Sequence, residues 1–309
     1  MRIGIGIGDL TGRPAGIDDL VAQAKRAEAD GFASGWFANI FGVDAIMAAA
    51  LCARETTRLE LGTAVVPTFP RHPMAMAQQA LTAQAMARGR FTLGIGLSHQ
   101  IVIELMLGLS WARPYSHMKE YLEVLMPLIR TGKVEHAGEE YRVNVGVSVP
   151  GGQPCSVLVA ALAPKMLAIT GRVADGTITW MTGEKTLRDH TVPRLREAAA
   201  AAGRPAPRVV AGLPIVITRH VDKARESAAR QFQIYGTLPS YRAMLDREGA
   251  AGPADVAIVG DESAVGAALE RLRHAGTTDF LAIPFAVEDD ADAFERTRTF
   301  VAAQARRAG

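Results

Sequence analysis

Two stretches of this sequence have residue types that bind a phosphate group, and they are the first candidates for chemistry. In GIGLSHQ, residues 94–100, two glycines would let the backbone approach a ligand, and Ser98 and His99 could donate hydrogen bonds to it. In AALAPKM, residues 160–166, Pro164 would begin a helix whose first backbone N–H groups stay free for an anion. Both patterns also occur at ordinary strand and helix ends, so neither identifies a site alone.

A third glycine-rich stretch opens the chain but lacks the dinucleotide-binding pattern. Residues 4–9, GIGIGD, follow G-x-G-x-G instead of G-x-G-x-x-G, and Ala38 and Asn39 stand where that fold places an acidic residue. The alternative is that small residues let an inner strand pack closely against its neighbours. The sequence therefore disfavours a Rossmann domain.

Metal-dependent and nucleophilic catalysis are also disfavoured. The 7 histidines are scattered, and none is spaced from another histidine, aspartate or glutamate as metal ligands are. The sequence has no G-x-S-x-G motif, and no predicted strand end carries a carboxylate pair suited to glycoside hydrolysis. We therefore expect no metal site and expect the chemistry to come from a bound cofactor.

The residues at the predicted strand ends suit a large planar ligand. Most are apolar, aromatic or amide: Asn39, Phe41, Phe69, Trp180, Met181 and Phe285. From these we take Phe41, Phe69, Trp180 and Met181 as the candidate substrate wall. The alternative is that some of them cover the end of the fold or form a dimer interface.

These residues must be positioned by a regular alternation of strands and helices. Apolar runs predict strands at residues 2–7, 33–38, 59–66, 91–97, 156–161, 176–180, 208–218 and 279–284. Helical periodicity predicts helices at residues 17–29, 44–54, 73–87, 115–131, 164–174, 184–202, 222–235 and 262–275, a helical piece near Tyr241 and a last helix to Ala308. Such alternation is typical of a parallel sheet.

Two folds fit this alternation: an open doubly wound sheet and a closed (β/α)8 TIM barrel. The chain has no linker or shift in composition, which favours a single domain over residues 1–309 and hence the barrel. Residues 134–152 interrupt the pattern with polar, glycine-rich sequence, which predicts a short hairpin insertion after the fourth helix.

Composition excludes several partners. The net charge is only +2 and the basic residues are dispersed, so we expect no nucleic-acid or membrane partner. No apolar stretch approaches the roughly 18 uncharged residues that cross a membrane, and the N-terminus does not resemble a signal peptide. Cys52 and Cys155 are isolated in the sequence, which is typical of a reducing compartment. We expect a cytoplasmic protein.

Five motifs recur in the order of one known family. They are AEADGFASGWFAN (27–39), LELGTAVVPTFPRHPMAMAQQALT (59–82), RGRFTLGIGLSH (88–99), HMKEYLEVL (117–125) and GRVADG (171–176). Together they resemble the luciferase-like monooxygenase superfamily, and most closely its branch of coenzyme F420-dependent oxidoreductases. The C-terminal third of the chain adds only the alternation of strands and helices.

The resemblance implies a flavin or deazaflavin site at the C-terminal end of a barrel. In this family the third strand ends in a bulge with a non-prolyl cis peptide, whose backbone supports the central ring of the cofactor. Here the bulge falls at Ala64 and Val65, and the alternative is a trans strand that ends before the proline-rich turn. The other implied contacts are Asn39 for the head group, Gly96, Leu97, Ser98 and His99 for the ribityl or phosphate region, and Ala161, Leu162, Ala163 and Pro164 for the phosphate.

The sequence departs from the family at one important position. The deazaflavin-dependent sugar-phosphate and alcohol dehydrogenases that it resembles have Asp-His after the second strand, and that histidine is implicated in catalysis. Here the pair is Asn39-Ile40. Isoleucine cannot exchange a proton, so sugar-phosphate oxidation by that mechanism is disfavoured. Of the remaining imidazoles near predicted strand ends, His72 and His99, we nominate His99 as the catalytic residue.

The resulting hypothesis is an oxidoreductase that transfers a hydride between coenzyme F420 and a small, apolar organic substrate. The alternatives are an FMN-dependent monooxygenase on the same scaffold and a non-catalytic flavin-binding protein. The family often forms dimers, so we expect a homodimer, with the helix from Met74 to Met86 either at its interface or packed on the barrel. Trp36 and Trp180 are both expected near the cofactor.

Overall fold

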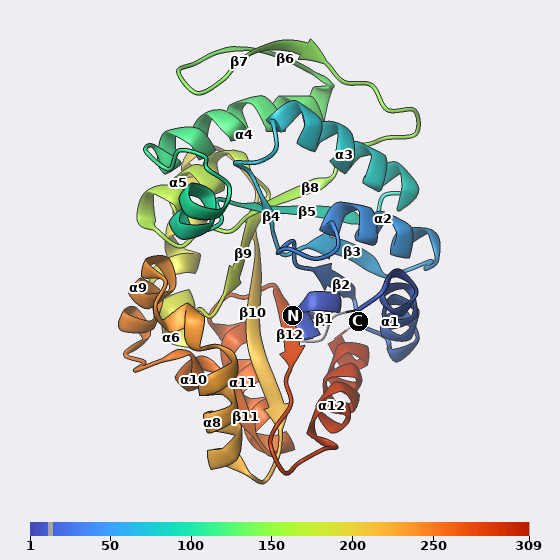
Figure 1. The fold of residues 1–309 in the computed structure, drawn as a ribbon, viewed down its shortest axis with the longest axis vertical. Helices are drawn as coiled ribbons and strands as arrows, with labels where there is room; N and C mark the ends of the chain where they lie inside the picture. The colour runs from blue at the N-terminus through green and yellow to red at the C-terminus, as the bar shows by residue number, and fades with distance from the viewer. Residues whose placement is uncertain (12–14, 309) are drawn as a thin grey trace.

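The computed structural model describes residues 1–11 and 15–308, and a closed barrel of parallel strands lies at its centre (Figure 1). The barrel strands are, in order, β1 (Arg2–Ile7), β2 (Ser34–Phe37), β3 (Glu60–Thr63), β5 (Phe91–Gly96), β8 (Ser156–Val159), β9 (Gly176–Trp180), β10 (Arg208–Ile217) and β12 (Asp279–Pro284). The barrel closes because β12 pairs with both β10 and β1. The predicted TIM barrel is confirmed, and the open doubly wound sheet is wrong.

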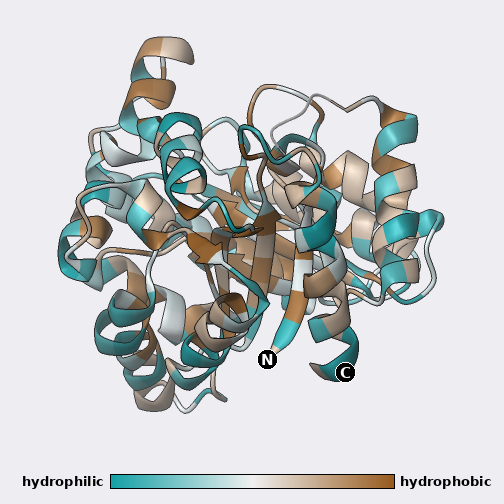
Figure 2. Ribbon diagram, turned by 90° about the horizontal axis from the view of Figure 1, so that it is seen from below, coloured by the Kyte–Doolittle hydropathy of each residue, from teal (hydrophilic) through white to brown (hydrophobic). Residues whose placement is uncertain are grey.

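Helices surround the barrel, and in Figure 2 the hydrophobic strands lie inside this ring. The longer helices are α1 (Ile17–Asp30), α2 (Ala45–Arg54), α3 (Pro73–Met86), α4 (Pro114–Thr131), α5 (Pro164–Val173), α7 (Val192–Ala201), α8 (Val221–Gln231), α9 (Pro239–Glu248), α11 (Glu262–His274) and α12 (Ala293–Ala308). The shorter helical pieces are η1 (Gly8–Thr11), η2 (Val102–Met106), α6 (Glu184–Thr186), η3 (Leu187–Thr191), η4 (Gln233–Gly236) and α10 (Pro253–Val256).

Local signals set several of the helix boundaries. The carboxylate of Asp44 accepts hydrogen bonds from two backbone N–H groups of the first turn of α2. Nδ1 of His72 accepts from the backbone N–H of Met74, 3.2 Å away, at the start of α3. Gly31 ends α1 in the left-handed region, with φ of 88°, which a residue with a side chain rarely adopts.

The structure differs from the predicted elements at several places, and one of them is the predicted helix over 222–235, which divides into α8 and η4. The third strand divides into β3 and the two-residue β4 (Val66–Pro67), with a bulge between them. The predicted helix over 184–202 is interrupted by the π-helical η3. Strand β11 (Ile258–Gly260) was not predicted, because its three residues are too few to show a strand period, and it pairs with the end of the long β10.

The segment between α4 and β8 forms an antiparallel hairpin of β6 (Lys133–Ala137) and β7 (Arg142–Gly146), at the top of Figure 1. Glu120 of α4 holds its turn, because the carboxylate accepts from the backbone N–H groups of Glu139, Glu140 and Tyr141 at 3.0, 2.8 and 2.9 Å. Burial alone would raise the pKa of Glu120, but these hydrogen bonds lower it to about 2.

A network of charged side chains closes the N-terminal end of the barrel. The guanidinium of Arg208 contacts Asp279 at 2.6 Å and Glu60 at 2.6 Å, and Arg2 contacts the other oxygen of Glu60 at 2.5 Å. Burial alone would raise the pKa of Glu60, but the charges of Arg208 and Arg2 lower it. Four residues from four strands are thus joined by a charge-assisted network at the base.

Trp36 lies inside the barrel, in one apolar cluster with Ala64 and Val65 of the predicted cofactor site. Its side chain has no exposed surface, its indole N–H donates to Ser34 Oγ at 2.8 Å, and Arg208 of the basal network lies 5.6 Å from the ring centroid. Glycines on both neighbouring strands make room: a Cβ atom at Gly62 would be 2.5 Å from the ring, and one at Gly4 2.9 Å from Nε1. The opening glycines therefore allow close packing, the alternative to a phosphate loop.

Cys52 and Cys155 are both buried free thiols. Burial raises the pKa of each to about 12, so neither is a reactive thiolate. Among the helices of residues 1–11 and 15–308, none has the length and apolar character needed to span a bilayer.

Candidate functional site

The C-terminal ends of the barrel strands, with the loops that follow, are called the mouth here. The bulge after β3 lies at this end, and the peptide bond between Ala64 and Val65 is cis, as predicted. The backbone N–H of Ala64 donates to Phe37 O of β2 at 2.7 Å. Ala64 and Val65 are both half-buried and pack beside the residues that fill the barrel interior.

Gly94 of β5 fits tightly against the strand end that leads into this bulge. The hydroxyl of Thr63 donates to Gly94 O at 2.8 Å and accepts from Gly94 N–H at 2.9 Å. A Cβ atom on Gly94 would lie 2.0 Å from Thr63 O and 3.2 Å from Val65 Cγ1. A glycine is therefore required at this position for the bulge to take this path.

The end of β5 carries the next group of candidates. Leu97, Ser98 and His99 are half-buried, and Ser98 has a φ of 67°, in the left-handed region. The carbonyl of His99 accepts from Val102 and Ile103 N–H at 2.9 and 3.0 Å, which begins η2. Burial lowers the pKa of His99, so its imidazole is neutral at pH 7.

The start of α5 has the properties of an anion site. Ala161 is buried, Leu162 is half-buried, and Ala163 and Pro164 are exposed. Ala163 is the N-cap residue, and no side chain caps the helix there, so backbone N–H groups of the first turn remain for a ligand. A phosphate fits this end of the helix.

His190 of η3 holds this loop and was missed by the sequence analysis. Its Nε2–H donates to the carbonyl of Leu162 at 2.8 Å, and the ring is only 3% exposed. Burial lowers the pKa of His190, which keeps the ring neutral. Nothing in the sequence links the two residues, because they come together only when α7, which directly follows η3, packs against α5.

Asn39, at the end of β2, is fixed by its neighbours. Its Oδ1 accepts from Ala45 N–H at 3.1 Å and from Arg71 at 3.5 Å, and Arg71 is paired with Asp44. Because this oxygen already accepts two hydrogen bonds, a ligand would meet the NH2 end of Asn39. The adjacent residue, at the position of the family's histidine, is Ile40, whose side chain has no titrating group and is 53% exposed.

Phe69 belongs to a packed stack behind the bulge. Its ring lies parallel to that of His117 at 3.9 Å between centroids and stacks on Trp111 at 5.1 Å. Nε2 of His117 is 2.9 Å from the hydroxyl of Thr68, and Nδ1 is 3.4 Å from that of Tyr141. Burial lowers the pKa of His117 to about 4, so this imidazole is neutral over most of the pH range.

The buried imidazole of His117 predicts a pH dependence of stability. The unfolded chain takes up a proton near pH 6.5 and the folded chain only near pH 4, so stability is lost as the pH falls through this interval. Wild type should lose about 2 to 3 kcal/mol more of its unfolding free energy than His117→Gln between pH 7.5 and 4.5. Urea titrations at several pH values measure this difference.

The control for this prediction is His274→Gln, which makes the same substitution at an exposed histidine of α11 and removes none of the buried contacts of His117. The pH range of the measurement ends at 4.5 because of Glu120. Its pKa is lowered in the folded protein, so the stability that this carboxylate contributes is lost mainly at more acidic pH. Parallel curves for wild type and His117→Gln would contradict the prediction.

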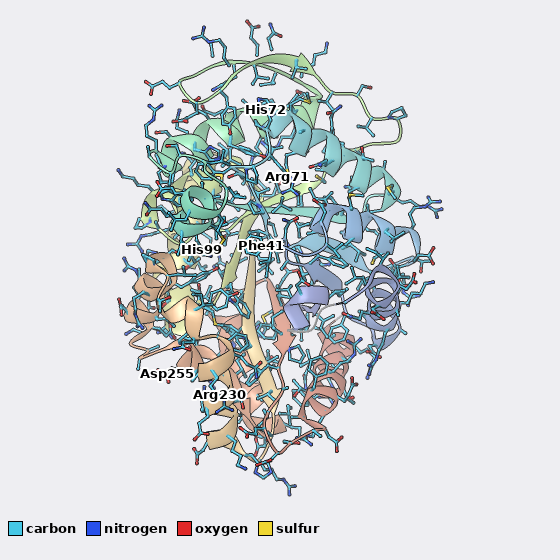
Figure 3. The ribbon with its side chains drawn as sticks, viewed as in Figure 1. Phe41, Arg71, His72, His99, Arg230 and Asp255 are labelled. Atoms are coloured by element: carbon cyan, nitrogen blue, oxygen red, sulfur yellow. The ribbon has the colours of Figure 1, made fainter. Side chains whose placement is uncertain are left out.

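The remaining candidates of the substrate wall differ in exposure. Trp180 is half-buried at the end of β9, Phe41 is 69% exposed after β2, and Met181 is completely buried. Met181 therefore packs behind Trp180 and reaches no open surface. Phe41 and His99 both lie over the middle of the ribbon in Figure 3.

Aromatic residues that the sequence analysis missed surround Trp180. Its indole ring contacts Phe232 and Tyr235 edge-on, at 5.9 and 5.7 Å between centroids, and Tyr241 in turn contacts Tyr235 and His99. These rings come from the C-cap of α8, from η4 and α9, from the last residue of β9 and from the loop after β5. Their positions in the sequence show no shared motif, so only the fold identifies them as a group.

The closed (β/α)8 barrel defines a TIM-barrel protein, and the glycine-lined strand ends and the uncapped helix lie at the end where this fold usually binds ligands. Within this class the chain belongs to the luciferase-like monooxygenase family, whose sequence profile matches residues 3–307.

Three known proteins show what the chain is similar to in sequence and in fold. An uncharacterized protein of Mycobacterium tuberculosis is 30% identical over 252 residues, which are 75% of this chain and 74% of the relative. An F420-dependent glucose-6-phosphate dehydrogenase of Nakamurella multipartita is 32% identical over 156 residues, or 48% and 46% of the two chains. The fold is that of coenzyme F420-dependent tetrahydromethanopterin reductase from Methanopyrus kandleri, with a TM-score of 0.80, 21% identity and 99% coverage of both chains.

Proposed function

We propose that this protein is an oxidoreductase that binds coenzyme F420 at the mouth and transfers a hydride between it and a small, apolar organic substrate. The observation that carries the proposal is the uncapped start of α5, held in place by the hydrogen bond from His190 to Leu162. Membership of the luciferase-like family and relatives that include an F420-dependent dehydrogenase support it.

The residues at the mouth fit a deazaflavin. Its ring would lie against Ala64 and Val65, and its head group would lie against Asn39. Its ribityl chain and phosphate would lie along Gly96, Leu97, Ser98 and His99. The phosphate would also contact the start of α5, at Ala161, Leu162, Ala163 and Pro164. The tight approach of the strands at Gly94 and Gly96, where a Cβ atom would collide with Thr63 or Val65, supports a close backbone contact with the ring. The deazaflavin would supply hydride chemistry at its C5 carbon.

The protein's own side chains would bind the substrate and exclude water from it. Phe41, Phe69 and Trp180 form the wall in this proposal, with Met181 behind Trp180. His99 would hold or deliver a proton beside the substrate, because a neutral imidazole can donate from one nitrogen and accept at the other. Ile40 provides no such group, so we do not propose sugar-phosphate oxidation.

The cofactor can be identified by titration of the purified apo-protein with F420 and, separately, with FMN, followed by tryptophan fluorescence. Trp36 and Trp180 should both report binding, since Trp36 lies in one apolar cluster with Ala64, Val65 and Trp180, and Trp180→Phe is the control that separates the signal of Trp180 from those of Trp36 and Trp111. We expect F420 to bind with a Kd of about 1 μM, which corresponds to about −8 kcal/mol, and FMN to bind at least about tenfold more weakly.

The other outcomes select the alternatives. Tighter binding of FMN than of F420 would assign the protein to the oxygen-using branch of the family. If neither compound binds, both cofactor assignments are wrong. Tight F420 binding without turnover of a panel of enones and imines by the reduced cofactor would favour a non-catalytic binding protein.

Two properties predicted from the sequence also stay proposals: a cytoplasmic location and a homodimer. For the dimer, Met76 of α3 is completely buried against the barrel, whereas Met47 of α2 is 72% exposed and Leu51, one turn later, is 37% exposed. The exposed apolar surface in this part of the chain therefore belongs to α2 rather than to the methionine-rich α3.

A further inference from the structure

A continuous series of ring contacts crosses the mouth, which we call the aromatic arc. The centroid distances are 5.6 Å between His99 and Tyr241, 5.2 Å between Tyr241 and Tyr235, 5.7 Å between Tyr235 and Trp180, 5.9 Å between Trp180 and Phe232, and 5.8 Å between Phe232 and Phe285. The arc thus joins the ends of β5, β9 and β12 to the helical region formed by α8, η4 and α9.

The members of the arc are packed edge to face and are only partly covered. The four contacts from Tyr241 to Phe285 have interplanar angles between 75° and 88°, so neighbouring rings do not cover one another's faces in parallel stacks. Phe285 is 3% exposed, and the other five rings are half-buried. The arc therefore combines a fixed position with ring surface that still contacts solvent.

The arc is largely apolar, and its hydrogen-bond donors lie in the half that runs from His99 to Trp180. For His99, Tyr235 and Tyr241, burial is the main influence on the pKa, lowering that of the imidazole and raising those of the phenols. The phenols are therefore protonated donors at pH 7. A charged substrate would lose hydration against such a wall, whereas a flat, uncharged one would gain contact area.

We propose that the aromatic arc binds the face of a planar, uncharged, conjugated carbonyl compound, and that the hydroxyl of Tyr241, whose ring contacts that of His99, donates a hydrogen bond to its carbonyl oxygen. This inference rests on the proposed function and names its substrate class. It assigns Trp180 and Phe232 to contact with the flat skeleton of the substrate, and Tyr241 to its polar end. Saturated, puckered molecules and anions of the same size would bind poorly.

The test measures binding rather than turnover, on protein loaded with oxidised F420 and on the apo-protein. The probes are 2-acetylnaphthalene, its saturated decahydro analogue and 2-naphthoate, titrated by isothermal calorimetry. We expect the flat ketone to bind at least about tenfold more tightly than either other probe, since aromatic contacts contribute about 0.5 to 1.5 kcal/mol each beyond their area.

Three variants separate the parts of the proposal. Trp180→Leu should weaken binding of the flat ketone about tenfold, and Trp180→Phe, which keeps a ring, should restore most of it. Tyr241→Phe should weaken binding of the flat ketone about threefold to tenfold. It should leave unchanged the binding of naphthalene, a fourth probe that has no carbonyl. Phe300→Leu on α12, a half-buried aromatic away from the arc, is the matched control and should have no effect.

The outcomes distinguish this inference from the proposed function. Equal binding of the flat and saturated ketones in both forms of the protein, or unchanged affinity in correctly folded Trp180→Leu, would overturn the arc as a binding surface. If Tyr241→Phe weakens the binding of the ketone and of naphthalene equally, the proposed hydrogen bond is overturned. If F420 fails to bind while selectivity for the flat ketone persists, the proposed function is wrong and the arc is still a binding surface.

Discussion

Replacing Gly94 by alanine is expected to lower the free energy of unfolding by more than about 4 kcal/mol, because the new methyl group has no space. It would lie 2.0 Å from the carbonyl oxygen of Thr63, which is a backbone atom that cannot rotate away. Thr63 is also bound to Gly94 by two hydrogen bonds of 2.8 and 2.9 Å, so moving it would break both. Urea denaturation followed by circular dichroism measures the loss.

The matched control is the same substitution at Gly266, in the middle of α11. A Cβ atom there would be 3.9 Å from the nearest atom, in the ring of Phe300, so it would fit without strain. Alanine favours the helix over glycine, and Gly266→Ala should therefore raise stability by about 0.5 to 1 kcal/mol. A Gly94→Ala protein within 1 kcal/mol of wild type would show that the barrel relaxes around the bulge more easily than this packing implies.

Gly94→Ala also tests whether the bulge supports the cofactor. Gly94 lies next to Val65, so a displacement that accommodates the methyl group moves the surface assigned to the deazaflavin ring. Any folded fraction of the variant should bind F420 at least about tenfold more weakly, a loss of about 1.4 kcal/mol. Full F420 affinity in folded Gly94→Ala would contradict the placement of the ring at this bulge.

Replacing Arg208 by methionine should destabilise the protein by about 3 to 5 kcal/mol, which is typical of a buried ion pair that loses one partner. The change leaves the carboxylates of Asp279 and Glu60 without their main counter-ion, and their side chains are only 3% and 17% exposed. Methionine keeps apolar bulk below Trp36, so the loss reports the charge more than the packing. Thermal and urea unfolding at pH 7 measure it.

Arg2→Met is the control at the same network. The side chain of Arg2 is 44% exposed, so its ion pair with Glu60 competes with water and should be worth less than about 1 kcal/mol. The difference in unfolding free energy between wild type and Arg208→Met should also become smaller as the pH falls. Without Arg208, Glu60 is a buried carboxylate whose pKa is raised, and its protonation removes the unpaired charge. A deficit that is constant with pH would point to lost packing instead.

Much of the barrel could be predicted from the sequence because its signals are local. The strands β1 and β12 occur as predicted, since apolar runs bounded by glycine, proline or charged residues are visible within a few positions. The position of the cis peptide between Ala64 and Val65 was also predicted, but from the family resemblance and not from any local pattern. The short β11 was missed because three residues carry no period.

The sequence by itself determined the alternation of strands and helices, the family, and the candidate cofactor contacts at the ends of β3, β5 and β8. Only the tertiary structure decided that Trp36 fills the barrel, that Arg208 joins Glu60 and Asp279, and that His190 holds the loop before α5. It also brought the rings of the aromatic arc together. These contacts join residues that are far apart in the chain. They depend on strand register and barrel closure, which decide the direction of each side chain and cannot be recognised from its neighbours in the sequence.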